Sequence, residues 1–138
     1  MATIKSYTDI EQSKKLAEIL PLDSADMHYA RIKDDYELRI WEAYLSPIPK
    51  ICAFFVENLP CWSLTALLDL MPQRIYDELG CRTFGMAKSW DKRRYQVFYE
   101  HKTAYVQKEA ETAIDAVFEM IIWLNENKKN IITMSRAE

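Results

Sequence analysis

Glycine is scarce in this chain, with two residues in 138, against a usual share of about 7%. This scarcity excludes collagen-like segments, glycine-rich linkers and the dinucleotide-binding fingerprint, which requires three glycines. Apolar runs are also short: the longest cover residues 51–56 and 117–124. Neither approaches the roughly 20 residues that span a bilayer, and the first residues lack the apolar core of a signal peptide. We therefore expect no membrane association.

Cysteine and histidine are few and scattered. Cys52, Cys61 and Cys81 are odd in number and not closely spaced, and the two histidines are His28 and His101. A disulfide framework needs an even count, so the cysteines favour a reducing, cytoplasmic location. The closely spaced cysteine pair of a zinc knuckle and the ligand order of an EF-hand are both missing. We expect neither a metal site nor any other cofactor.

Apolar side chains are abundant, at 49% of the residues, which excludes disorder for most of the chain. The length suits one domain, and a chain of this size buries a sizeable core. The sequence therefore predicts a single domain over residues 1–138. Residues 1–8 and 128–138 show no clear period, and we expect them to be peripheral or frayed.

Hydrophobic periodicity predicts an alternation of helices and strands. Three helices are expected, over residues 10–20, 64–71 and 112–127. Six strands are expected, over residues 27–33, 36–45, 51–56, 82–88, 94–101 and 103–107. Because short turns join these strands, antiparallel pairing is favoured. The predicted fold class is α+β, with one antiparallel sheet, helices packed on it, and the order helix–strands–helix–strands–helix.

Local signals mark several ends of these elements. Thr8 and Glu11 have the spacing of a capping box, and Ser63 is the predicted N-cap of the second helix. Pro72 is expected to end that helix. Residues 75–79 are predicted to add a helical turn closed by Gly80.

The apolar faces of these elements predict one common core. The ten expected core residues are Leu38, Ile40, Leu64, Leu67, Leu68, Val97, Ile114, Val117, Phe118 and Ile121.

Cys61 is the one candidate nucleophile. It precedes a predicted helix N-terminus, where the helix dipole lowers the pKa of a thiol. A base would have to come from His28 or His101, and no local motif brings either of them close. Cysteine is also among the most buried residue types, so packing explains it equally well. We assign no catalytic residue, and a thiol-dependent enzyme at Cys61 is kept as the third hypothesis.

Residues 74–108 are basic in a chain whose net charge is −3: they hold eight Lys and Arg against four Asp and Glu. Aromatic residues are interleaved with these charges, as on sheet faces that bind single strands. The candidate nucleic-acid face consists of Lys88, Trp90, Lys92, Arg93 and Arg94. The whole-chain charge opposes a nucleic-acid footprint, so this is the second hypothesis. A solvated hairpin turn is its alternative explanation.

The last predicted helix is apolar over roughly 260° of its circumference, whereas a helix resting on a sheet needs little more than ~100°. Either the chain itself covers the excess, or a second copy does. The candidate self-association face is formed by Ala116, Met120 and Trp123. Aromatic residues and methionine are enriched at interfaces, so this flank favours a homodimer.

Four stretches of the chain form a recognisable set. They are residues 11–16 (EQSKKL), 23–27 (DSADM), 60–72 (PCWSL, then LL, then Pro) and 115–124 (DA, EMI and WL). Together they resemble an uncharacterised family of small proteins of gut bacteria that are often associated with prophages and mobile elements. The resemblance spans roughly residues 9–127, and PCWSL is its most specific part. It implies an accessory cytoplasmic protein and assigns no functional residue.

The leading hypothesis from the sequence is a small, non-catalytic cytoplasmic interaction module. Its partner is an unidentified protein or a second copy of the chain.

Overall fold

The computed structural model describes residues 5–32, 40–51, 56–77, 80–89, 93–101, 104–129 and 132–134. These residues form an α+β fold with three α-helices and two antiparallel sheets. The mixed class is thus as predicted, but the single predicted sheet is wrong. The chain divides into two compact units, residues 6–66 and residues 1–5 with 67–138, and each is described by itself.

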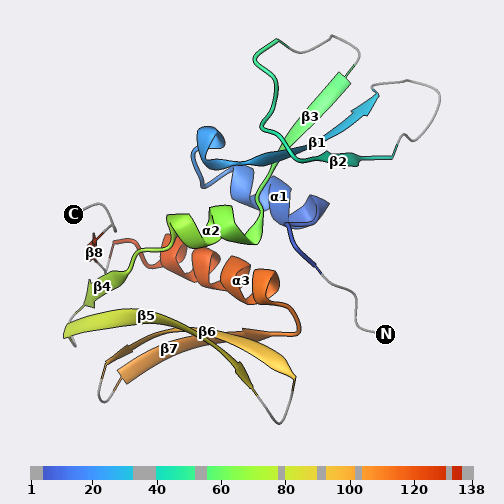
Figure 1. Ribbon diagram of the computed structural model, residues 1–138. Helices are drawn as coiled ribbons and strands as arrows, with labels where there is room; N and C mark the ends of the chain where they lie inside the picture. Colours follow the sequence, from blue (N-terminus) through green and yellow to red (C-terminus); the bar gives the residue numbers. More distant parts are fainter. Residues whose placement is uncertain are drawn as a thin grey trace. The chain divides into compact units, whose positions relative to one another are not determined.

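The first unit, residues 6–66, contains helix α1 (Ile10–Ala17), a short 3₁₀ helix (Leu22–Ser24) and three strands, β1 (Met27–Ile32), β2 (Glu42–Tyr44) and β3 (Val56–Cys61). The strands form a sheet of order β2-β1-β3, in which β1 pairs antiparallel with both neighbours. Helix α1 packs against this sheet (Figure 1). Met27, Tyr29 and Cys61 are buried there, with Ile10 and Leu59 packed against them.

The second unit contains β4 (Arg74–Asp77), β5 (Gly80–Ser89), β6 (Arg94–His101), β7 (Ala104–Ala110), α3 (Ala113–Glu126) and β8 (Ile132–Met134). Its sheet has the order β7-β6-β5-β4-β8, and α3 lies along one face of it (Figure 1). Val97 and Tyr99 share one face of β6, the strand that α3 contacts, and both are fully buried. Helix α2 (Leu64–Leu70) spans the boundary between the two units.

Several predicted elements are confirmed. Strand β6 has the predicted bounds, and α3 begins after its N-cap Thr112, whose hydroxyl accepts a hydrogen bond from the Asp115 amide. Ser63 caps α2 by accepting a hydrogen bond from the Ala66 amide at 3.2 Å. Strand alternation and helix caps depend on residues that are close together along the chain, so the sequence alone contains these signals.

The capping box of α1 lies one residue later than predicted. Asp9, not Thr8, accepts from the Gln12 amide, and the Gln12 side chain accepts from the Asp9 amide. Both pairs have the required spacing. Thr8 does not cap the helix, because its side chain is buried and its hydroxyl contacts the hydroxyl of Ser13.

The region around β3 and β4 differs from the prediction. Of the strand predicted over residues 51–56, residues 52–55 lie outside the described part, and β3 starts at Val56 and includes Pro60. Proline is tolerated there because β3 is an edge strand. The predicted helical turn over residues 75–79 is instead strand β4, paired with β5. Gly80, the first residue of β5, has a φ of 116°, a backbone conformation that only glycine adopts without strain.

The predicted core is confirmed for Leu67, Val97, Ile114, Val117 and Ile121, each at most 6% exposed. Leu64, Leu68 and Phe118 are half-buried. The predicted core position of Ile40 is wrong, because this side chain is 84% exposed. Leu38 lies outside the described residues. Of the strand predicted over residues 36–45, the structure describes only Glu42–Tyr44.

Candidate functional site

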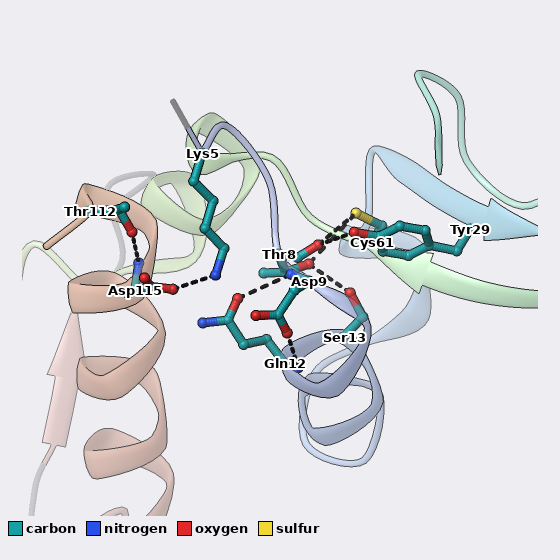
Figure 2. A network of polar contacts seen from close by, with 9 residues as sticks. All are labelled: Lys5, Thr8, Asp9, Gln12, Ser13, Tyr29, Cys61, Thr112 and Asp115. Atoms are coloured by element: carbon teal, nitrogen blue, oxygen red, sulfur yellow. Dashed lines mark hydrogen bonds and ion pairs between the residues drawn. The ribbon is translucent and has the colours of Figure 1, made fainter. Parts of the chain in front are cut away.

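Cys61 lies at the end of β3 in a closed polar cluster. Its thiol donates a weak hydrogen bond to the Thr8 carbonyl at 3.5 Å and accepts one from the Thr8 hydroxyl at 3.6 Å (Figure 2). The Thr8 hydroxyl also lies 2.8 Å from the hydroxyl of Ser13, and the Tyr29 hydroxyl donates to the Thr8 carbonyl at 2.6 Å. Cys61, Thr8 and Ser13 have no exposed surface. The cluster holds the N-terminal segment to the sheet.

The electrostatics of this cluster oppose a reactive thiol. Burial raises the pKa of Cys61, and hydrogen bonds from Thr8, Ser13 and Tyr29 offset this only in part. His28 is no base for it: Cys61 pairs with Met27, so the neighbouring His28 points to the opposite face of the sheet. The His28 ring donates to the Ser46 carbonyl instead. The side chain of His101 lies outside the described part of the chain.

The basic segment does not gather on one face of its sheet. Lys88 pairs with Tyr95, and its ammonium lies 5.5 Å from the centre of that ring, on the α3 side of the sheet. Arg94 follows on the opposite face, where its guanidinium lies 3.3 Å from the carboxylate of Glu109. Arg93 is exposed in the hairpin turn. Trp90 and Lys92 lie outside the described residues. The described members of the predicted cluster do not share one face of the sheet.

The predicted self-association face on α3 is largely interior. Ala116 and Met120 have no exposed surface, so those two side chains are covered within the chain and cannot meet a second copy. Trp123 is half-buried. This outcome agrees with the alternative that the chain itself covers the wide apolar arc of α3.

A further site, which sequence analysis missed, is the second face of the three-stranded sheet. Alternation along the paired strands places one set of side chains opposite the face that α1 covers. This set, the open face, consists of His28, Ala30, Ile32, Glu42, Tyr44, Val56, Asn58 and Pro60. Because β1 carries apolar residues on both sides, its sequence already indicates that both faces need cover.

A hollow of about 420 Å³ opens on this face. Its lining residues are Ala30, Arg31, Ile32, Ile40, Glu42, Tyr44 and Val56. The apolar lining is strongly exposed for side chains of this type: 84% for Ile40, 51% for Ile32 and 44% for Tyr44. A hollow with an apolar floor and a few polar groups at its rim is typical of binding sites.

Polar contacts hold the rim of the hollow in place. On the other face of the sheet, which α1 covers, the Arg31 side chain forms an ion pair with Glu57, and its guanidinium lies 4.3 Å from the centre of the Trp41 ring. The Tyr44 ring stacks on His28, with centroids 5.1 Å apart. The Tyr44 hydroxyl donates to the Glu42 carboxylate at 2.9 Å, which raises the pKa of Tyr44. Because the Arg31 side chain pairs with Glu57 on the other face, Glu42 is the charged residue of the open face as described, and it makes the rim negative.

Within the described ranges, no three His, Cys, Asp or Glu side chains come together as metal ligands. None of the helices in the described part of the chain has the length and apolar character needed to cross a membrane. No protein-family model, curated protein or solved structure matches the chain.

Proposed function

We propose that this chain is a small, non-catalytic interaction module of the cytoplasm, and that it binds an apolar segment of a partner protein with its open face. The observation that supports this most directly is the hollow, because aliphatic side chains line it and remain in contact with solvent. The family resemblance adds the context of an accessory protein of a mobile element.

The energetics favour a partner for this face. Burying a fully exposed isoleucine is worth about 1.5–3 kcal/mol. Burial of Ile40 alone, at 84% exposed, therefore supplies about a tenfold to a hundredfold gain in affinity. The negative rim at Glu42 favours a partner segment that carries basic as well as apolar side chains.

The two other hypotheses have less support. A single-strand binder would use basic and aromatic side chains on one face, whereas Lys88 and Arg94 lie on opposite faces and Arg94 is paired with Glu109. A thiol enzyme at Cys61 would need access to the sulfur, which is enclosed.

The test is affinity purification of the tagged full chain from its native cell, followed by mass spectrometry of bound protein and sequencing of bound nucleic acid. Three forms are compared: the wild type, Ile40→Lys, and the matched control Leu22→Lys, which changes an aliphatic residue that is 61% exposed outside the sheet. We expect Ile40→Lys to lose proteins that the wild type and the control retain.

Protein capture that Ile40→Lys leaves unchanged would refute the open face as the binding surface. Bound nucleic acid that disappears in a Lys88→Ser, Arg94→Ser variant would instead support the single-strand hypothesis.

A further inference from the structure

Strand β2 is an open edge of the three-stranded sheet. In the order β2-β1-β3 it pairs with β1 on one side, and among the described strands none lies on its other side. Its three residues, Glu42, Ala43 and Tyr44, are all exposed. An unpaired edge presents backbone N–H and C=O groups that can pair with another strand, and proteins usually block such edges. This edge carries no proline or lysine, the common blocking residues.

The sequence of β2 is complementary to itself. If two copies pair antiparallel with Ala43 opposite Ala43, Glu42 of each copy lies opposite Tyr44 of the other. Directly opposite residues are about 4.5–5.5 Å apart at their Cβ atoms. The hydroxyl of Tyr44 already donates to Glu42 within one strand, so the same donor and acceptor meet twice across the pair. Like charges are not directly opposed in this register.

The same register also matches the apolar residues that flank β2. It places Trp41 of each copy opposite Leu45 of the other, and Leu45 is 89% exposed in the single chain. A short backbone pairing alone is weak, so burial of these side chains supplies the additional stabilisation that a dimer requires.

We propose that two copies of this chain associate edge to edge through β2, about a twofold axis at Ala43, to form one continuous six-stranded sheet. A twofold axis perpendicular to a sheet keeps equivalent faces on the same side. The two open faces therefore join into one surface, and each hollow stays accessible to a partner protein. This inference does not depend on what the open face binds.

The decisive test is a disulfide across the twofold axis. Ala43→Cys is introduced into the full chain with Cys52→Ser and Cys81→Ser, which leaves only the buried Cys61 besides the new thiol. Cα atoms of opposed antiparallel residues are about 4.5 or 5.5 Å apart, within the range that a disulfide spans. We expect mild oxidation to give a dimer of twice 16.3 kDa on a non-reducing gel. The control, Leu22→Cys in the same background, is expected to stay monomeric.

Charge exchange tests the register independently. One variant, Tyr44→Glu, places acidic groups opposite each other at both pairs. A second, Glu42→Lys with Tyr44→Lys, places basic groups there. We expect each variant alone to dissociate roughly tenfold more readily than the wild type, and an equimolar mixture to regain the association, because every opposed pair is then of opposite charge.

Light scattering from micromolar to submillimolar concentrations measures these dissociation constants. A wild-type mass that stays monomeric throughout, with no disulfide formed by the Ala43→Cys variant, would overturn the inference. A dimer that survives both charge variants but dissociates on Trp123→Glu would also overturn it, because the interface would then lie on α3. In either case the capture experiment with Ile40→Lys still decides the proposed function separately.

Discussion

The two sheets of this protein are alike in plan and differ on one face. Each is antiparallel and has one face covered by a single helix, α1 or α3. On the second face of the five-stranded sheet, β5 presents the small residues Thr83, Gly85 and Ala87. The half-buried Phe98 ring lies against Gly85 on this face, and Arg94 and Glu109 form an ion pair. On the second face of the three-stranded sheet, Ile32 and Tyr44 and a hollow are open to solvent.

The difference indicates which face needs a partner. The second face of the five-stranded sheet carries small residues, paired charges and one aromatic ring that already packs on Gly85, so it is stable in water without further cover. On a sheet face with exposed aliphatic groups, the contact of these groups with water is unfavourable, and burial against a partner removes that cost. Because the helix-covered faces are apolar in both units, the composition of the second face, not the architecture, distinguishes the two.

The largest effects are expected where both units are alike, in their helix cores. Leu67→Ala in α2 and Leu16→Ala in α1 each remove a side chain with no exposed surface. Each should lower the free energy of unfolding by about 2–5 kcal/mol in urea denaturation. The single-domain prediction expects both substitutions to shift one common transition. A loss below about 0.5 kcal/mol would contradict the core position of that leucine.

The second face of the five-stranded sheet should tolerate little added volume at Gly85. A Cβ atom there would lie 2.2 Å from Cε2 of the Phe98 ring, which must therefore move. We expect Gly85→Ala to destabilise by about 1–3 kcal/mol, and by less when combined with Phe98→Leu. Thr83→Ala, an exposed position on the same strand face, is the control and should change little. Equal losses with and without Phe98 would exclude this contact as the cause.

Alkaline pH should weaken both units through one buried tyrosine in each. Burial raises the pKa of Tyr29 and of Tyr99, whose hydroxyls donate to the carbonyls of Thr8 and Pro72. The unfolded chain therefore releases these protons at lower pH than the folded chain, so stability falls as pH rises above the unfolded value of about 10. Each tyrosine contributes a loss of up to about 1.4 kcal/mol per pH unit.

Urea denaturation at a series of alkaline pH values measures this loss. Tyr29→Phe and Tyr99→Phe should each make the decline shallower. The raised pKa of Cys61 adds a similar decline that starts at about pH 9, because the thiol of the unfolded chain ionises there. A Tyr→Phe variant with an unchanged slope would show that its tyrosine ionises in the folded state as readily as in the unfolded one.

The smallest effect is expected on the open face. Ile40→Lys should change the free energy of unfolding by less than about 0.5 kcal/mol, because Ile40 is 84% exposed. Ile114→Lys, at a fully buried position of α3, is the contrasting variant and should prevent stable folding. A large loss for Ile40→Lys would mean that the side chain packs within the chain, and the comparison between the two faces would fail.

Prediction from the sequence succeeded where the signal was local and long. The alternation of Tyr95, Val97 and Tyr99 predicted β6 with its observed bounds, and the helical period over residues 112–127 predicted α3 to within one residue at each end. It failed where two local solutions were equally good. Thr8 with Glu11 and Asp9 with Gln12 both fit a capping box, and only the burial of Thr8 beside Ser13 decided between them.

The candidate site was missed for a related reason. Periodicity assigned Ile40 to a core face, and it gives no information on whether a second layer covers that face. The wide apolar arc of α3 suggested an interface, yet Ala116 and Met120 are covered within the chain. In both cases the sequence revealed the apolar pattern, but it did not reveal whether those side chains are exposed or covered.

By itself, the sequence determined the mixed class and the elements whose periods or caps are complete within a few turns, because these depend on neighbours along the chain. Tertiary structure alone decided that residues 74–77 pair as a strand with β5 and β8, and that β3 runs through Pro60. It also decided which sheet face stays open. Strand pairing and burial join residues far apart in sequence, so no local pattern contains them.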